Sequence, residues 1–118
     1  MDAAPPWLAA IRGWHAHVYF EAATRDRAAA LRDRLAAAFP AAVLGRWHEQ
    51  PVGPHPMAMC QVAFGPALFP ALVPFLALHR QGLAVLVHPE TGRPRADHLD
   101  HAMWFGAVLP LNAAVLPE

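Results

Sequence analysis

Histidine carries most of the chemistry that this sequence offers. The chain contains eight histidines in 118 residues. Histidine is the commonest metal ligand and the only side chain that normally titrates near neutral pH. His15 and His17 alternate with apolar residues in the stretch 13–21, and Tyr19 continues the alternation. Because successive side chains of a strand point to opposite faces, these three share one face. The spacing allows metal binding or proton transfer, and it equally fits a hydrated sheet face.

Three other stretches present an imidazole near a predicted strand end. His55 lies in a turn-rich connection, residues 50–56, whose prolines restrict its backbone. His88 ends the apolar run 83–88, and His98 lies in the polar segment 97–101. Convergence of His17, His55 and His88 would form a metal site. The alternative is a histidine-rich face that serves only in dimerisation.

Alternation and helical spacing predict the elements that would position these groups. Strands are expected at 13–21, 42–49, 57–64 and 83–88. One helix is expected from a Thr24 cap to Pro40, and another within 65–81. Pro70 and Pro74 cannot both lie in a regular helix interior, so the regular part of the second helix could begin as late as Pro74. The last apolar stretch, 102–109, is expected to be a strand or an extended arm.

The order strand, helix, strand, strand, helix, strand predicts an α+β domain of the ferredoxin-like βαββαβ kind, with a four-stranded antiparallel sheet and two helices on one face. In 42–49, Val43, Gly45 and Trp47 are predicted to face the helices. The first and last strands should be neighbours. The opposite sheet face then carries His15, His17, Tyr19, Arg46, His48, Met59, Gln61 and His88.

The amino-acid composition predicts the number of domains and argues against some classes of binding partner. The length and a hydrophobic content of 56% predict one domain, 1–118, with a sizeable core. Nine basic residues balance nine acidic ones, which argues against nucleic acid or an anionic membrane. The single cysteine, Cys60, is expected in the core of a protein from a reducing compartment. The first residues lack the basic charge of a secretory signal and no long apolar run occurs, so a soluble, cytoplasmic protein is predicted.

An uncovered sheet face and the apolar tail 102–116 predict a homodimer, as in a dimeric α/β barrel.

Four motifs in order resemble the DOPA 4,5-dioxygenase family of small non-haem extradiol dioxygenases. They are His17-Val18-Tyr19-Phe20, Gly53-Pro54-His55-Pro56, Leu83 to Pro89 with Thr91-Gly92, and Asp97-His98 followed by Trp104-Phe105-Gly106. The resemblance spans about residues 14–112 and implies a ferredoxin-like, frequently dimeric fold. It also implies iron(II), O2 and a catechol such as DOPA or a related catecholic acid, whose ring is cleaved beside its two hydroxyls.

The resemblance also implies roles for individual residues. His17, His55 and His88 would be the iron ligands, and His98 would be the acid/base, although His98 and His55 could exchange these roles. Asp97 and Glu21 are the candidates for a carboxylate ligand. The substrate pocket would be lined by His15, Tyr19, Arg46, His48 and Gln61, with Arg46 placed to meet a substrate carboxylate.

Two other functions fit the same residues. One is a ferredoxin-like dimer that binds a metal or small molecule without turnover. The other is a cofactor-free monooxygenase or isomerase of the dimeric α/β-barrel kind. Iron dependence separates these alternatives from a dioxygenase.

Overall fold

A five-stranded antiparallel sheet organises the chain, as described in a computed structural model for residues 3–118. The strand order is β2-β3-β1-β4-β5. The elements, in chain order, are α1 (Pro6–Ala9), β1 (Gly13–Phe20), α2 (Arg25–Ala38), β2 (Val43–His48), β3 (Ala58–Phe64), α3 (Phe69–His79), β4 (Val85–Glu90), α4 (Pro94–His98) and β5 (Met103–Phe105). Short 3-10 turns occupy Ala22–Thr24, Pro66–Leu68 and Ala113–Val115.

Strand β1 is the central strand and pairs with both β3 and β4. Its register places His15 opposite His88, and His17 opposite Gln61 and Leu86. Strands β1 and β4, the first and last of the four predicted strands, are therefore neighbours in the sheet, as predicted. It brings the histidines of β1 and β4 onto adjacent strands.

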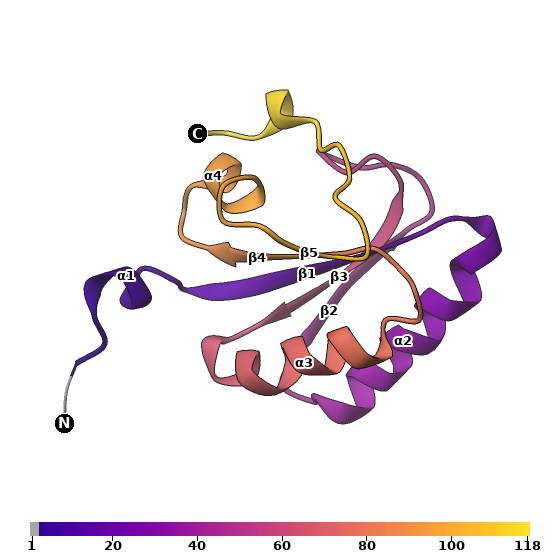
Figure 1. Ribbon diagram of the computed structural model, residues 1–118, viewed down its shortest axis with the longest axis horizontal. Helices are drawn as coiled ribbons and strands as arrows, with labels where there is room; N and C mark the ends of the chain where they lie inside the picture. Colours follow the sequence, from indigo (N-terminus) through magenta and orange to yellow (C-terminus); the bar gives the residue numbers. More distant parts are fainter. Residues whose placement is uncertain (1–2) are drawn as a thin grey trace.

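Both long helices cover one face of the sheet, as predicted, and lie below it in Figure 1. Helix α2 buries one stripe at helical spacing, including Leu31 and Leu35, and α3 contributes Leu72 and Leu76. These side chains pack against alternate strand residues and against Leu83, which lies just before β4. The strand residues are Ala16, Val18, Phe20, Cys60, Val62, Phe64, Val85 and Val87. The apolar positions of β1 and β3 thus form the helix side of the core.

The prediction of a four-stranded sheet is wrong because β5 pairs with the outer edge of β4. The residues after β5 then turn back over the sheet face opposite α2 and α3 (Figure 1). Trp104, Leu109 and Leu111 pack there against Tyr19, Met59 and Leu86. This C-terminal segment, residues 102–118, therefore covers part of the face that was expected to be open.

Two backbone hydrogen bonds fasten the C-terminal segment to the rest of the chain. The Asn112 amide donates to the Pro54 carbonyl at 2.8 Å, and the Arg95 amide donates to the Pro117 carbonyl at 3.0 Å. One bond reaches the loop that carries His55 and the other reaches α4. The segment is consequently tied to two of the elements that present histidines.

A bulge in β2 corrects the predicted alternation of residues 42–49. Leu44 pairs with Val62 and Trp47 with Cys60, so Gly45 and Arg46 together stand opposite Gln61 alone. The extra residue puts both Leu44 and Trp47 on the helix side, whereas they were assigned to opposite faces. A Cβ on Gly45 would lie 3.1 Å from atoms of Gln61, which explains glycine at this close approach.

The two long helices lie within the predicted ranges, with Thr24 at the N-cap of α2, and the structure adds two local details. The Thr24 hydroxyl accepts from the Glu21 amide at 3.0 Å and makes no cap bond to α2. Helix α3 begins at Phe69 and retains Pro74 inside it. Pro70 falls in the first turn, where no amide donor is needed, and burial of Leu72 and Leu76 offsets the one bond that Pro74 lacks.

None of the helices within residues 3–118 is long and apolar enough to cross a bilayer.

Candidate metal centre

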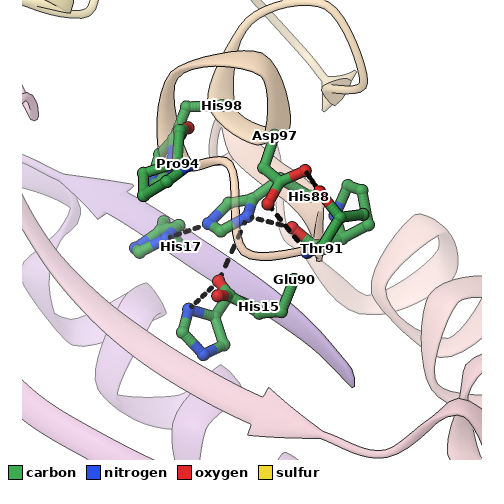
Figure 2. A network of polar contacts seen from close by, with 9 residues as sticks. His15, His17, His88, Glu90, Thr91, Pro94, Asp97 and His98 are labelled. Carbon is green, nitrogen blue, oxygen red and sulfur yellow. Dashed lines mark hydrogen bonds and ion pairs between the residues drawn. The ribbon is translucent and has the colours of Figure 1, made fainter. Parts of the chain in front are cut away.

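A cluster of imidazoles lies on the sheet face opposite α2 and α3, and we call it the histidine cluster. Strand β1 supplies His15 and His17, β4 supplies His88, the loop before β3 supplies His55, and α4 supplies His98. His17, His55 and His88 are buried, whereas the other two are half-buried. Residues far apart in the chain meet here because β1 lies between β3 and β4 and α4 folds back over β4 (Figure 2).

The cluster contains two overlapping triads that share His17. One comprises His15, His17 and His88, and the other His17, His55 and His98; within each, the potential ligand atoms lie within 4.8 Å of one another. His17 and His88 are in direct contact, with 3.0 Å between their Nε2 atoms. The structure therefore gathers all three predicted ligands in one cluster but places His55 in a different triad from His88.

The outward nitrogens of four imidazoles are held by neighbours. His98 Nδ1 lies 2.7 Å from the Pro94 carbonyl, and His88 Nδ1 lies 3.0 Å from the Pro89 carbonyl. His15 Nδ1 is 3.0 Å from a Glu90 oxygen, and His55 Nδ1 is 2.7 Å from the Tyr19 hydroxyl. These contacts occupy the Nδ1 atoms and leave the Nε2 atoms available.

Burial keeps the deepest imidazoles neutral at pH 7. Burial, with a smaller contribution from the neighbouring His98, lowers the pKa of His88 to about 3 and that of His55 to about 4. Burial, followed by the charges of His55 and His88, lowers the pKa of His17 well below its usual value. Neutral imidazole is the form that binds metals.

The residues fit a divalent transition metal. Imidazole nitrogens are preferred ligands of such ions. Metal–imidazole bonds are about 2.1 Å long, so one ion could be reached by both Nε2 atoms of His17 and His88, which lie 3.0 Å apart. His17 Nδ1 is also buried without a hydrogen-bond partner in the described part of the chain. The ring of His17 is therefore held only through its Nε2 contact with His88.

The two carboxylates considered as ligands lie elsewhere. Asp97 is buried, but its oxygens accept from the Thr91 amide at 2.8 Å and the Thr91 hydroxyl at 2.6 Å, so it ties α4 to the turn after β4. Glu21 is exposed beyond the end of β1 and belongs to neither triad. The carboxylate that does touch the cluster is Glu90, which was expected in a turn. Its position two residues after His88 could have identified it, because both then share one strand face.

The predicted substrate-contacting residues are only partly gathered. Tyr19 is buried at the cluster, where burial raises its pKa, and Gln61 is opposite His17. His48 is opposite Met59, and its charge contributes to the low pKa of His55. Arg46 is exposed in the bulge of β2. Of these four, Tyr19 thus contacts a histidine of the cluster, His55, and Gln61 pairs with another, His17.

One cavity reaches the histidine cluster, and a second lies near the loop of His55. One of about 250 Å³ is bounded by His15 and Glu90 and is also lined by Arg12, a cation that the sequence did not single out. Another of about 460 Å³ lies beside Pro56 and Met57, next to the loop of His55. Of these two cavities, only the smaller one is lined by a histidine of the cluster, His15.

Comparisons with known proteins agree across most of the chain. The model of the Dopa 4,5-dioxygenase family matches residues 14–115. A DOPA 4,5-dioxygenase of Amanita muscaria is 36% identical over 115 residues, covering 91% of this chain and 50% of that protein. An uncharacterized 21.2 kDa protein of Botryotinia fuckeliana is 34% identical over 123 residues, covering 94% of this chain and 67% of that protein. The chain thus spans about half to two thirds of these relatives.

A solved structure is similar over nearly its whole length. The crystal structure of a Nostoc punctiforme protein, described as a candidate dioxygenase, superposes with a TM-score of 0.89 at 52% identity. The match covers 91% of this chain and 92% of that one. The fold around the histidine cluster is therefore shared with a protein of the same size.

Proposed function

The chain belongs to the Dopa 4,5-dioxygenase family, and from this premise we propose that it is an iron(II)-dependent extradiol dioxygenase. Its substrates would be O2 and a small catechol such as DOPA or a related catecholic acid, with the ring opened beside its two hydroxyls. The observation that carries the proposal is the direct contact of two buried, neutral imidazoles, His17 and His88, within a larger histidine cluster.

His17 and His88 would hold the iron, with a third nitrogen from the same cluster. His55 is the third ligand indicated by the sequence motifs, and His15 is the one that completes a triad with both. Bound there, iron(II) would supply open coordination positions for catechol and O2 and a route for an electron between them.

The chain's own residues would bind the substrate and move its protons. Catechol binding releases a proton and ring opening requires one. His98 is half-buried, and with Nδ1 bonded to the Pro94 carbonyl its Nε2 is free to accept and return that proton. His55 is the alternative proton carrier, because the Tyr19 hydroxyl at 2.7 Å can exchange a proton with it.

The surroundings suit a small aromatic acid. His15, Tyr19, His48 and Gln61 are the proposed contacts, and the C-terminal segment with Trp104 shields this face from water. Arg46 remains the proposed partner for a substrate carboxylate. We also retain the homodimer and the cytoplasmic location as proposals from the sequence.

An oxygen-consumption assay tests the function. Purified protein is treated with chelator, supplied with iron(II) or left without it, and mixed with a series of catechols under air. We expect oxygen uptake and a new visible absorbance from the ring-opened product only with iron, and loss of both in His17→Ala. His101→Ala, at an exposed position outside the triads, is the matched control.

The outcomes separate the alternatives. Turnover that persists without iron would instead support a cofactor-free monooxygenase. Iron binding without turnover of any catechol in the series would instead support a metal-binding dimer.

A further inference from the structure

Glu90 is the one carboxylate seen in contact with the histidine cluster among residues 3–118. It ends β4, two residues after His88, and shares its face of the sheet. One of its oxygens lies 3.0 Å from His15 Nδ1 and 3.5 Å from His88 Nδ1 (Figure 2). A single side chain therefore reaches two imidazoles that come from neighbouring strands.

These contacts determine which ring nitrogen carries the proton. An ionised carboxylate and a backbone carbonyl only accept hydrogen bonds. His15 Nδ1 faces the Glu90 oxygen, and His88 Nδ1 faces both that oxygen and the Pro89 carbonyl at 3.0 Å. A neutral His88 donates from Nδ1 to the Pro89 carbonyl. A neutral His15 is favoured with its proton on Nδ1, which faces the Glu90 carboxylate at 3.0 Å, so each ring keeps its lone pair on Nε2.

The free lone pairs belong to one triad. His88 Nε2 lies 3.0 Å from His17 Nε2, and His15 completes the triad with these two. His55 differs, because its Nδ1 faces the Tyr19 hydroxyl, which can donate as well as accept and so does not fix the proton. The tautomers of His15 and His88 are fixed by groups that only accept, whereas that of His55 is not.

We propose that Glu90 is a positioning residue of the metal site, which orients His15 with Nε2 directed to the ion, as the Pro89 carbonyl does for His88. It follows that His15, His17 and His88 are the nitrogen ligands, and that His55 and His98 remain for substrate and protons. The inference rests on the proposed metal-dependent function, which it deepens. Partners of this kind fix ring orientation and raise ligand basicity, and their loss typically lowers metal affinity about 10- to 100-fold.

Metal affinity measured without oxygen or catechol tests the proposal. Cobalt(II) and zinc(II) are titrated into metal-free protein in competition with a chromophoric chelator. Glu90→Ala should weaken binding by about 10- to 100-fold. Glu90→Gln should lose less, since its carboxamide oxygen still accepts from Nδ1. Asp33→Ala removes an exposed carboxylate of α2 and should leave the affinity unchanged. His15→Ala should weaken binding more than His55→Ala.

The tautomers provide a readout that is independent of metal and of activity. Nitrogen-15 spectra of the histidine side chains in the metal-free protein distinguish a protonated Nδ1 from a protonated Nε2. In Glu90→Ala the proton of His15 should redistribute toward Nε2. His98, whose Nδ1 is held by the Pro94 carbonyl, should keep its pattern and serves as the internal control.

Each outcome bears on a different statement. If Glu90→Ala binds cobalt and zinc as tightly as the unaltered protein, or if the His15 tautomer does not change, the role of Glu90 is overturned while the metal site stands. If His55→Ala weakens binding and His15→Ala does not, the ligand assignment is overturned. If the unaltered protein binds neither ion, the proposed function fails, and the role of Glu90 fails with it.

Discussion

Acidification should destabilise the metal-free protein through its buried imidazoles. Burial lowers the pKa of His55 to about 4 and that of His88 to about 3, whereas an imidazole in the unfolded chain titrates near 6.5. Between these values the unfolded state binds more protons than the folded state. The free energy of unfolding therefore falls as pH decreases below about 6.5, and the stability that these groups contribute is fully present only above that pH.

The expected size follows from the two pKa values. At pH 5 both imidazoles remain neutral in the folded protein but are protonated in the unfolded chain. Each imidazole then lowers the free energy of unfolding by about 1.36 kcal/mol per pH unit. Over the roughly 1.5 pH units between 5 and 6.5, this amounts to about 2 kcal/mol. The two together cost about 4 kcal/mol, and the lowered pKa of His17 acts in the same direction. Since small domains are stable by roughly 5–15 kcal/mol, the change is easily measured.

Urea unfolding at pH 8 and pH 5, with chelator present throughout, provides the assay. The free energy of unfolding should fall by about 4 kcal/mol or more between the two pH values. His55→Gln removes one titrating group and should reduce this difference by about 2 kcal/mol. His101→Gln alters an exposed histidine and should leave the difference as it is.

A difference below about 1 kcal/mol in the unaltered protein would refute the reasoning. The imidazoles would then be protonated in the folded state at pH 5. Such a result would mean that water reaches the cluster far more freely than its burial indicates.

Three further predictions concern metal, assembly and catalysis. Purified protein should hold about one divalent transition metal per chain; metal analysis of the double variant His17→Ala, His88→Ala should show its loss, and unchanged content would contradict the ligand assignment. Light scattering at micromolar concentration should give a homodimer of the 12.8 kDa chain, because apolar side chains such as Val108 and Trp7 remain exposed; a monomer would count against it. His98→Gln should keep its iron yet lower turnover about 10²- to 10⁴-fold, whereas His17→Gln should lose iron. Equal loss of iron from both variants would make His98 a ligand.

The sequence predicted the parts of the fold that follow from a regular period. In β1 and β3 strict alternation assigned His17, Tyr19 and Met59 to one face and Val18 and Cys60 to the other, as the structure has them. The two long helices, α2 and α3, were found in the same way because their buried leucines recur at helical spacing, whereas the short α1 and α4 were not predicted. The adjacency of the first and last predicted strands followed from the order of the elements, and it brought His88 to β1.

Features that break the period or act over long distances were missed. The bulge at Gly45 and Arg46 shifts alternation by one residue, and nothing in the local pattern shows which strand carries the extra residue. The contact of Trp104 with the far sheet face depends on how the chain turns after β5, which periodicity does not encode.

The metal site shows the same limit. The order of the motifs identified His17, His55, His88 and His98 as a group. Their division into two triads depends on side-chain directions from four separate segments: β1, the loop before β3, β4 and α4. Glu90 was overlooked because Glu90-Thr91-Gly92 has turn composition, although β4 continues through Pro89 to reach it.

The fastening of the C-terminal segment has a consequence for local opening of the protein. Two residues of this segment make the fastening bonds: Asn112 donates to the Pro54 carbonyl, and Pro117 accepts from the Arg95 amide. Detachment of this segment would expose the loop of His55 and α4 together, so the two should behave as one cooperative unit in hydrogen exchange, with a free energy of opening below that of global unfolding. The rigidity of the solvent side of the histidine cluster would then depend on how firmly the C-terminal segment, residues 102–118, is attached, and not on the stability of the sheet beneath it.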